Sequence, residues 1–365
     1  MDKMNICFFS GDITRTGGTE RVAIMIANEL NKDDNYEISF VSLVEKRDKT
    51  YFAIDEGIPR WTLYDRPVSG TTHFFGYVHR IRKILKENDI DILIDIDGII
   101  DVYSVLAKRH TKTKVVSWEH FNMYHHPSQK LRSRVRKFSV KRVDAIVTLT
   151  EQDKGYYEEV FNPKCPVAAI CNPVSYTGID NTYDEESKKI ISIGRLTHQK
   201  GFDRLVDIAD GVLRKHSDWE WFVYGEGEDK ETLLQSIKEK EINNLHLMGN
   251  ADDIDYKYKE SAMFVMTSRY EGLPMTLLEA KYYKLPIVSY DIKTGPRECI
   301  IDSVNGYLVK DGNQEEIVDR INELIEDKEK RKEFSNHALD ETDKFDLSYI
   351  ISQWKKLFEE LGRAQ

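Results

Sequence analysis

Residues 188–201, KKIISIGRLTHQKG, join a short apolar strand to a basic loop that contains glycine. A helical segment over about 201–215 follows directly, so the stretch has the strand–loop–helix order of a βαβ unit. Strands that alternate with helices form parallel sheets, and such sheets bind ligands at the carboxyl ends of their strands. We therefore expect Arg195 and Lys200 to lie on the ligand side of a parallel sheet.

The same alternation continues on both sides of a break at residues 172–187, which lacks hydrophobic periodicity and which we interpret as a linker. The expected strands are 5–10, 36–44, 91–96, 114–118, 144–150 and 166–171 before the break, and 188–195, 219–225, 244–249, 262–268, 285–290 and 306–309 after it. This pattern predicts two doubly wound, Rossmann-like α/β domains, 1–172 and 173–345, that face each other across a cleft. A final amphipathic helix within 346–365 is expected to cross back to the first domain.

Composition limits the class of protein. The chain has 365 residues, of which 40% are apolar and 32% charged, and its net charge of −10 argues against a surface that binds nucleic acid throughout. No segment approaches the roughly 20 apolar residues of a membrane helix, and the first apolar stretch is too short for a signal peptide. The cysteine spacings match no zinc or redox motif, which favours free thiols in a reducing compartment. We expect a cytoplasmic protein.

Two glutamates in SRYEGLPMTLLEA, residues 268–280, suggest the ligand. Glu271 follows a buried strand in the loop that Gly272 opens, and Glu279 falls in the second turn of the next helix. Carboxylates accept hydrogen bonds only, so they suit sugar hydroxyls, whereas Arg195 and Lys200 suit phosphate. The set fits a nucleotide sugar. The alternative for each glutamate is a helix-start carboxylate or an ordinary solvated side chain.

Taken together, GRLTHQKG at 194–201 and SRYEGLPMTLLEAKYYKLPIVSYD at 268–291 resemble the retaining glycosyltransferases of family 4. This group has the GT-B fold and includes many bacterial cell-surface polysaccharide enzymes, and the resemblance covers nearly the whole chain. It implies that Arg195 and Lys200 bind the diphosphate of the donor. It also implies that Glu271 contacts the hydroxyls of the donor hexose and Glu279 those of the ribose.

The resemblance extends to two motifs of the first domain. His120, in VVSWEHFN, matches a histidine that lies beside the anomeric centre in relatives, although a lone histidine is more often structural. Gly17 and Gly18 precede a helix for which Thr19 is a plausible N-cap. A glycine-rich loop at a helix N-terminus can bind an oxyanion, and in the family this loop borders the donor phosphates and the acceptor. A purely structural turn is the alternative.

Further donor contacts are expected from backbone at strand ends in the second domain. Gly194, Gly225 and Gly249 would let the backbone approach a nucleotide closely. In KTGPREC, residues 293–299, the N–H of Gly295 can face a sugar or phosphate oxygen, unless the segment is only a tight turn. The Thr294-Gly295-Pro version resembles the branch that uses UDP-linked galactose, glucose or N-acetylhexosamines.

Three features concern metal, acceptor and membrane. Asp95-Ile-Asp97 has the DxD form of a metal motif, but it lies in the other domain from the cationic clamp, so we expect no metal and assign Asp97 to the acceptor side. Glu119 would tune His120 or position the acceptor. The segment 129–142 has seven basic residues and no acidic one. It is either a solvated helix face or a site for an anionic membrane or a lipid-linked phosphate, through Arg132, Arg134, Arg136 and Lys137.

These expectations amount to a metal-independent, retaining glycosyltransferase without a cofactor, in which retention is implied by the resemblance. It would move a hexose or N-acetylhexosamine from a UDP-sugar to a hydroxyl of a glycan or lipid-linked acceptor and form an α-linkage. It would work in the cytoplasm, peripherally at the inner face of the cell membrane, and would not bind nucleic acid. The alternatives are a GT-B nucleotide-sugar epimerase or phosphorylase, or a non-catalytic partner subunit of the same fold.

Overall fold

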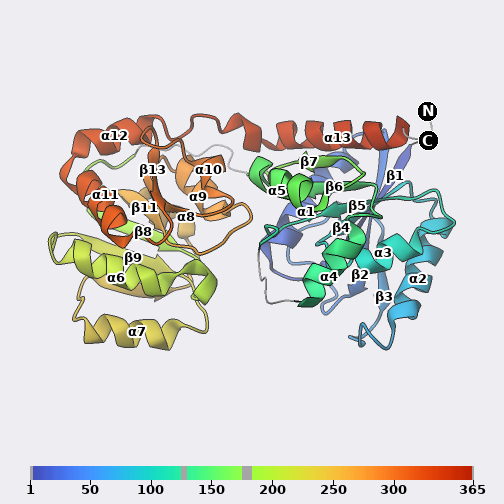
Figure 1. The fold of residues 1–365 in the computed structure, drawn as a ribbon, viewed down its shortest axis with the longest axis horizontal. Helices are drawn as coiled ribbons and strands as arrows, with labels where there is room; N and C mark the ends of the chain where they lie inside the picture. The colour runs from blue at the N-terminus through green and yellow to red at the C-terminus, as the bar shows by residue number, and fades with distance from the viewer. Residues whose placement is uncertain (1–2, 125–129, 175–182, 364–365) are drawn as a thin grey trace. The chain divides into compact units, whose positions relative to one another are not determined.

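The computed structural model describes residues 3–124, 130–174 and 183–363. The chain forms two compact units, each with one parallel sheet and flanking helices (Figure 1). Unit 1 comprises Met1–Pro173 together with Lys344–Gln365, and unit 2 comprises Val174–Asp343. The predicted class, two Rossmann-like α/β halves, is confirmed.

The sheet of unit 1 has seven strands in the order β3-β2-β1-β4-β5-β6-β7, and all neighbours are parallel. Its central strands read as apolar runs because helices cover both faces of such a sheet, and every residue of β4 is buried. The strands are β1 (Met4–Ser10), β2 (Tyr36–Val44), β3 (Arg60–Tyr64), β4 (Ile92–Ile96), β5 (Lys114–Trp118), β6 (Ala145–Thr148) and β7 (Val167–Ala169).

The helices of unit 1 include the last helix of the chain. They are α1 (Gly18–Asn31), α2 (Phe74–Glu87), α3 (Asp101–Ala107), α4 (Lys130–Ser139), α5 (Glu151–Phe161) and α13 (Leu347–Arg363). In α13 the apolar face is buried, with Trp354 fully enclosed and its ring 5.0 Å from that of Trp118 in β5. The ammonium of Lys355 also bonds Asp33, so α13 returns to the first domain as expected.

Unit 2 has a six-stranded parallel sheet in the order β10-β9-β8-β11-β12-β13. Its strands are β8 (Lys189–Ile193), β9 (Glu220–Tyr224), β10 (Leu245–Gly249), β11 (Met263–Met266), β12 (Ile287–Asp291) and β13 (Gly306–Lys310). Its helices are α6 (Phe202–Leu213), α7 (Lys230–Glu239), α8 (Ile254–Lys259), α9 (Met275–Tyr282), α10 (Pro296–Cys299), α11 (Gln314–Glu326) and α12 (Lys328–Asn336); two 3-10 turns lie at His198–Lys200 and Asp343–Phe345.

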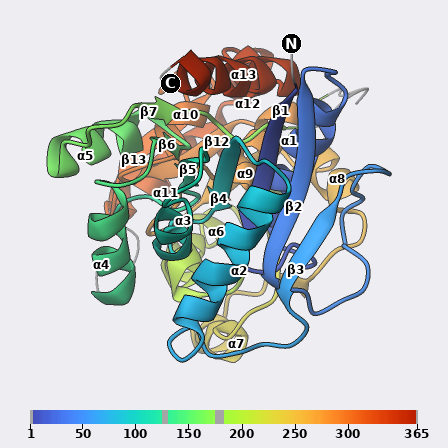
Figure 2. The ribbon, with the colours of Figure 1, turned by 90° about the vertical axis from the view of Figure 1, so that its right-hand side faces the viewer.

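Four elements of unit 1 were not predicted, namely β3, α2, α3 and α5. Strand β3 is a short edge strand with several accessible side chains, so its sequence RWTLY carries little hydrophobic signal. Helix α2 follows it in the chain (Figure 2). Its side chains Tyr77, Val78, Ile81 and Leu85 are buried in the core. In the part of the chain that the structure describes, no helix is long and apolar enough to cross a membrane.

Candidate functional site

The strand order of unit 2 reverses next to β8, which pairs with β9 on one side and with β11 on the other. From β8 the chain proceeds outward to β9 and β10, and from β11 it proceeds in the opposite direction to β12 and β13. The loops after β8 and β11 therefore leave the carboxyl edge side by side, at the position where open α/β sheets bind ligands. Arg195 and Lys200 lie on the first loop and Glu271 on the second.

Lys200 and Glu271 form an ion pair across these two loops. The Nζ–Oε1 distance is 2.7 Å, and the two side chains are only 18% and 8% exposed. The lysine stem packs on Gly194, where a Cβ atom would lie 3.3 Å from Cγ and Cδ of Lys200. A carboxylate with so little exposure needs a nearby cation, and Lys200 supplies it. The structure thus brings together two side chains that the sequence assigned to the same donor.

Arg195 differs from Lys200 although both belong to the same loop. Its side chain is exposed, and among residues 3–124, 130–174 and 183–363 none forms a hydrogen bond or ion pair with its guanidinium. A guanidinium presents a planar fork of donors that matches phosphate oxygens. Arg195 therefore offers an uncompensated positive charge at the switch point, whereas the charge of Lys200 is already balanced.

The two loops are held together by residues that the sequence did not single out. The Arg269 backbone N–H donates to the carbonyl of Gln199 at 2.8 Å, and the Gln199 side chain donates to the carbonyl of Tyr270 at 3.1 Å. The hydroxyl of Thr267 donates to the carbonyl of Gly201 at 3.0 Å. These bonds fix the position of Lys200 relative to Glu271 before any ligand binds.

A second tie runs through the Arg269 side chain. Its guanidinium bonds both carboxylate oxygens of Asp203 at 2.7 and 2.5 Å, and it also donates to the His198 carbonyl at 2.8 Å. The hydrogen bonds from Arg269 lower the pKa of the Asp203 carboxyl. Arg269 lies within the segment 268–291, and Asp203 lies just after the segment 194–201. No local spacing reveals their pairing, because the two residues are 66 positions apart.

Exchanging the two charges tests this tie. Asp203→Arg and Arg269→Asp should each lower kcat by about tenfold, because a misplaced Lys200–Glu271 pair costs transition-state positioning. The double variant should exceed both single variants, since it restores the opposite charges. Steady-state transfer kinetics on all four proteins measure this. A double variant no better than the worse single variant would show that the pair does not act as a unit.

The loop of Glu271 is also braced from the side of β12. The hydroxyl of Thr294 is buried and donates to the Glu271 carbonyl at 2.6 Å. Gly295 has φ of +103°, and a Cβ atom there would lie 2.5 Å from Cδ of Pro274 and 2.9 Å from the Gly272 carbonyl oxygen. The glycine is thus required by close backbone packing against the Glu271 loop. Thr294 and Gly295, predicted as donor-binding residues, support Glu271 in this structure.

Glu279 lies on α9 and accepts a hydrogen bond from the hydroxyl of Tyr258, with an O–O distance of 2.8 Å. Tyr258 is fully buried, and its ring stacks on that of Tyr283 at 5.0 Å with an interplanar angle of 4°. The hydroxyl orients the Glu279 carboxylate, whose side chain is half-buried. Tyr258 gave no signal in the sequence, because a tyrosine in a short helix is indistinguishable from an ordinary core residue.

The other glycines of unit 2 allow loops to touch one another. Gly225 has φ of +141°, and a Cβ atom there would lie 1.9 Å from the carbonyl oxygen of Gly194. Its N–H donates to the carbonyl of Gly249 at 2.8 Å. The three predicted glycines, Gly194, Gly225 and Gly249, therefore meet at the carboxyl edge of β8, β9 and β10, where bulkier residues would separate the loops.

In unit 1 the corresponding edge carries His120, directly after β5. Its side chain is 7% exposed, and its Nε2 atom has no hydrogen-bond partner among the described residues. The ring lies 4.3 Å from that of Trp118. Burial lowers the pKa of His120 to about 3, although the neighbouring Glu119 acts in the opposite direction. His120 is therefore a neutral imidazole at physiological pH, able to donate or accept one hydrogen bond at Nε2.

Glu119 is engaged on the other side of this loop. Its carboxylate forms a bidentate pair with Arg136 of α4, with both N–O distances 3.2 Å, and the two side chains are 3% and 6% exposed. Arg136 also donates to the Met123 carbonyl at 2.7 Å, while the Met123 N–H donates to Asp153 at 2.8 Å. The segment that bears His120 is thus clamped between α4 and α5.

Asp97 and Arg132 repeat this arrangement at the end of β4. The guanidinium of Arg132 bonds the two Asp97 carboxylate oxygens at 2.6 and 2.9 Å. Asp97 also has φ of +108°, which is rare for a residue other than glycine, and its N–H donates to the carbonyls of Asp95 and Trp118. Backbone strain of this kind persists where surrounding structure holds it, often at functional sites.

The basic segment 129–142 requires a correction. Arg136 is buried and Arg132 is mostly buried, and each is neutralised by a carboxylate at a strand end. Only Arg134 and Lys137, of the four residues named for a membrane or lipid phosphate, have exposed side chains. The interpretation as a continuous basic face is therefore wrong. The sequence could not reveal this, because the partners Asp97 and Glu119 are remote from the segment along the chain. Residue 129 itself lies outside the described residues.

The DxD pattern does not form a metal centre in the described chain. Asp95 is fully buried and accepts a hydrogen bond from Ser104 at 2.7 Å, while Asp97 faces Arg132. Burial raises the pKa of Asp95 to about 7, and burial, together with the nearby Asp95 carboxylate, raises the pKa of Asp101 well above its usual value. Among residues with described positions, no group of three His, Cys, Asp or Glu side chains could hold a metal ion.

The glycine-rich loop after β1 differs from its prediction. The N-cap of α1 is Gly17, and the helix begins at Gly18, so the expectation of Thr19 as N-cap is wrong. A Cβ atom at Gly17 would lie 2.3 Å from Oε2 of Glu20, and Arg15 Nε donates to Oε1 of the same carboxylate at 2.9 Å. An anion bound at the start of this helix would therefore lie next to the buried Glu20 carboxylate.

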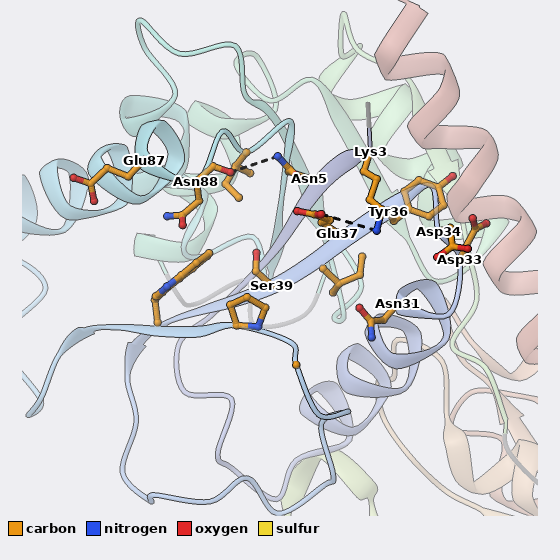
Figure 3. A pocket seen from close by; sticks show the side chains of 15 residues that line it. Lys3, Asn5, Asn31, Asp33, Asp34, Tyr36, Glu37, Ser39, Glu87 and Asn88 are labelled. Carbon is orange, nitrogen blue, oxygen red and sulfur yellow. Dashed lines mark hydrogen bonds and ion pairs between the residues drawn. The ribbon is translucent and has the colours of Figure 1, made fainter. Parts of the chain in front are cut away.

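A pocket of about 610 Å³ opens at the opposite edge of the unit 1 sheet (Figure 3). It lies near the amino ends of β1 and β2, and Figure 3 shows the Lys3 side chain directed toward Glu37 and that of Asn5 directed toward Asn88. Lys3 lies 4.0 Å from Glu37, and the Asn5 amide donates to the carbonyls of Asn88 and Asp89. It is thus remote from the carboxyl edge where Asp97 and His120 lie.

Comparison with known proteins gives one consistent family. The model of glycosyltransferase family 4 matches residues 16–177, and that of glycosyl transferases group 1 matches residues 179–340. An uncharacterized glycosyltransferase of Haemophilus influenzae is 31% identical over 351 residues, covering 96% of this chain and 98% of that protein.

Two further proteins show the same relationship over the full length. An α-1,4-N-acetyl-D-galactosaminyltransferase of Campylobacter jejuni, named for a glycan on PP-undecaprenol, is 26% identical and covers 99% of this chain and 100% of its own. The structure of the lipopolysaccharide outer core galactosyltransferase WaaB matches with a TM-score of 0.79 at 23% identity, covering 98% and 100% of the two chains. The chain belongs to the family 4 glycosyltransferases and has their GT-B fold.

Proposed function

We propose that this glycosyltransferase is a retaining enzyme that moves a hexose or N-acetylhexosamine from a UDP-sugar to an acceptor hydroxyl and forms an α-linkage. The single observation that carries the proposal is the grouping at the switch point of unit 2. There, an exposed arginine, which forms no hydrogen bond or ion pair with the described residues, shares a loop with Lys200, and Lys200 pairs with Glu271 of the adjacent loop. Phosphate and sugar hydroxyls are the ligand groups that this set recognises together.

Each side chain has a task in this proposal. The Arg195 guanidinium and the Lys200 ammonium stabilise the charge that grows on the departing diphosphate. Glu271 accepts hydrogen bonds from hydroxyls of the transferred sugar, and its ion pair with Lys200 fixes the position of its carboxylate. Glu279, oriented by Tyr258, accepts from the ribose. The proposal assigns stabilisation of this charge to the two side chains and includes no metal ion.

The acceptor is proposed to be a glycan or a lipid-linked glycan. This rests on the Campylobacter relative, which is named for a PP-undecaprenol glycan and whose whole length matches this chain. The neutral His120 has an Nε2 atom without a hydrogen-bond partner among the described residues, and it is proposed to meet a hydroxyl of the donor sugar next to the acceptor. Strained Asp97 stands at the switch point of the unit 1 sheet, where β1 and β4 adjoin, which suits the acceptor side.

Incubation with a panel of UDP-sugars, with UDP release measured in the presence and absence of glycan acceptors, tests the proposal. One UDP-sugar should be consumed, and nuclear magnetic resonance of the product should show an α-anomer. Release of an epimer or a sugar phosphate would identify the epimerase or phosphorylase alternative. Absence of both turnover and nucleotide-sugar binding would favour a partner subunit.

Arg195→Ala should lower kcat/KM by about a hundredfold, since one preorganised charge-assisted contact to the leaving group is lost. The melting temperature should stay within about 1 °C of wild type, because the side chain is exposed and forms no hydrogen bond or ion pair with the described residues. Exposed Arg134 of α4, replaced by alanine, is the matched control and should leave both quantities unchanged. Near-native turnover of Arg195→Ala would remove this residue from the clamp.

A further inference from the structure

A row of aromatic rings leads from the last helix of the chain to His120. The ring centres of Phe358 and Trp354 in α13 lie 5.8 Å apart, and that of Trp354 lies 5.0 Å from Trp118 in β5. The Trp118 ring in turn lies 4.3 Å from the imidazole of His120. The three aromatic side chains are fully buried, and that of His120 is 7% exposed. Packing on α13 is therefore continuous with packing on the imidazole.

The Trp118 ring restricts how the imidazole can turn. Nε2 of His120 has no hydrogen-bond partner among the described residues, so no bond at this atom fixes the ring. Side chains in a packed interior keep the rotamer that their neighbours leave open. The indole, at 4.3 Å, is such a neighbour, and the perpendicular contact of Trp354 on its other side limits its own movement. The direction of Nε2 therefore depends on two tryptophans.

Trp118 also holds Asp97, the strained residue at the end of the adjacent strand. Its backbone carbonyl accepts the Asp97 N–H at 3.1 Å, where φ of Asp97 is +108°. Strain of this kind persists only where the surrounding structure holds it. One residue of β5 thus contacts both His120, through its ring, and Asp97, through its backbone.

The two indoles are not explained by core packing alone. Nε1 of Trp118 and Nε1 of Trp354 are buried, and neither has an acceptor within residues 3–124, 130–174 and 183–363. A buried N–H without an acceptor costs free energy, whereas a phenylalanine ring would fill a core without that cost. An indole is wider than a phenyl ring, which lets Trp118 touch Trp354 and His120 at once.

We propose that Trp118 is a positioning residue for sugar transfer and that Trp354 of α13 holds it in place, so that the last helix of the chain helps to aim the His120 imidazole at the donor sugar. This role rests on the proposed function, which gives His120 its contact with that sugar. The same packing keeps water from the ring, and this burial lowers the pKa of His120 to about 3. Glu119 acts in the opposite direction but is paired with Arg136, and the rings of β5 and α13 carry no charge.

Transfer kinetics test the positioning with mild substitutions that keep an aromatic ring. Trp118→Phe and Trp354→Phe should each lower kcat about tenfold and leave KM for the consumed UDP-sugar within about twofold, because aim matters most in the transition state. In a His120→Gln background, Trp118→Phe should change kcat by less than about twofold, since the imidazole is no longer there to be aimed. Equal effects in both backgrounds would show that Trp118 serves only the fold.

Leu361→Ala is the matched control. Leu361 is 4% exposed on α13, seven positions after Trp354 and therefore on the same helical face. Its truncation leaves a cavity under the same helix, so the urea midpoint should fall, yet kcat per folded molecule should stay within about twofold of wild type. A tenfold loss of kcat in this control would overturn the specific role of the tryptophans.

A titration of the His120 imidazole by nuclear magnetic resonance needs no transfer activity. Its signal, assigned by its loss in His120→Gln, should not titrate between pH 5 and 8 in wild type. Trp354→Ala should admit water and raise the pKa toward its ordinary value of about 6.5, so protonation should appear as pH falls from 7 to 5. Leu361→Ala should behave like wild type.

The two measurements separate this role from the proposed function. If wild type transfers no sugar, the proposed function fails, and the titration still decides whether the tryptophans hold the imidazole. If wild type transfers sugar but the tryptophan variants match Leu361→Ala in kcat and in titration, the positioning role is overturned and the proposed function stands.

Discussion

Lys200→Ala should lower kcat/KM for sugar transfer by about a thousandfold and also destabilise unit 2 by about 2–3 kcal/mol. The two effects have different origins. The loss of activity reflects a missing cation on the leaving diphosphate and a displaced Glu271. The loss of stability arises because the Glu271 side chain, 8% exposed, loses the ammonium that lies 2.7 Å from it. Transfer kinetics and the urea midpoint measure the two separately.

The double variant Lys200→Ala/Glu271→Gln distinguishes these origins. It removes the buried negative charge together with its partner, so the urea midpoint should return most of the way to that of wild type. Activity should remain at or below the level of Lys200→Ala, because the variant restores neither the Lys200 cation nor the Glu271 carboxylate that accepts hydrogen bonds from the sugar. If activity recovered along with stability, Lys200 would serve the fold and not the reaction.

Arg136→Met should destabilise unit 1 by about 3–5 kcal/mol, as expected when one member of a buried ion pair is removed. Glu119 is 3% exposed, and in the variant its carboxylate would lose both guanidinium contacts. The Met123 carbonyl would also lose its donor, which loosens the segment that carries His120. Urea unfolding should show a lower midpoint with an unchanged slope.

Two companion variants make this result specific. Glu119→Gln/Arg136→Met should recover at least half of the lost stability, because no uncompensated charge stays buried. Arg134→Met, on the same helix but exposed, should change the free energy of unfolding by less than about 0.5 kcal/mol. An Arg136→Met protein as stable as Arg134→Met would contradict the buried pair and would reinstate a solvated basic face.

The order of the elements and the chemistry of the donor loops could be predicted from the sequence. Strands that are buried on both faces carry their own signal, as β4 and β11 do, because every position is apolar or nearly so. Arg195, Lys200 and Glu271 could be found because each follows such a strand. In a parallel sheet, the carboxyl ends of all strands lie at one edge, so the loops that carry these residues were expected to leave the sheet at that edge.

Elements at the edge of a sheet or exposed to solvent could be predicted less well from the sequence. Strand β3 is short and accessible, and α2 was not recognised beside it. Its buried residues Tyr77, Ile81 and Leu85 recur at helical spacing, but this pattern was not recognised in the sequence. The N-cap of α1 was misplaced by two residues, because Thr19 has the side chain of a good cap whereas Gly17 is used for its closeness to Glu20.

Sequence alone therefore determined which strands, loops and charges this protein has, since hydrophobic burial and residue chemistry are local properties. Only the tertiary structure decided which charges neutralise one another. Lys200 meets Glu271, Arg269 meets Asp203 and Arg136 meets Glu119, at separations of 71, 66 and 17 positions. The Coulomb energy of two charges depends on the distance between them and on their burial, and neither can be read from the number of residues that separates them along the chain.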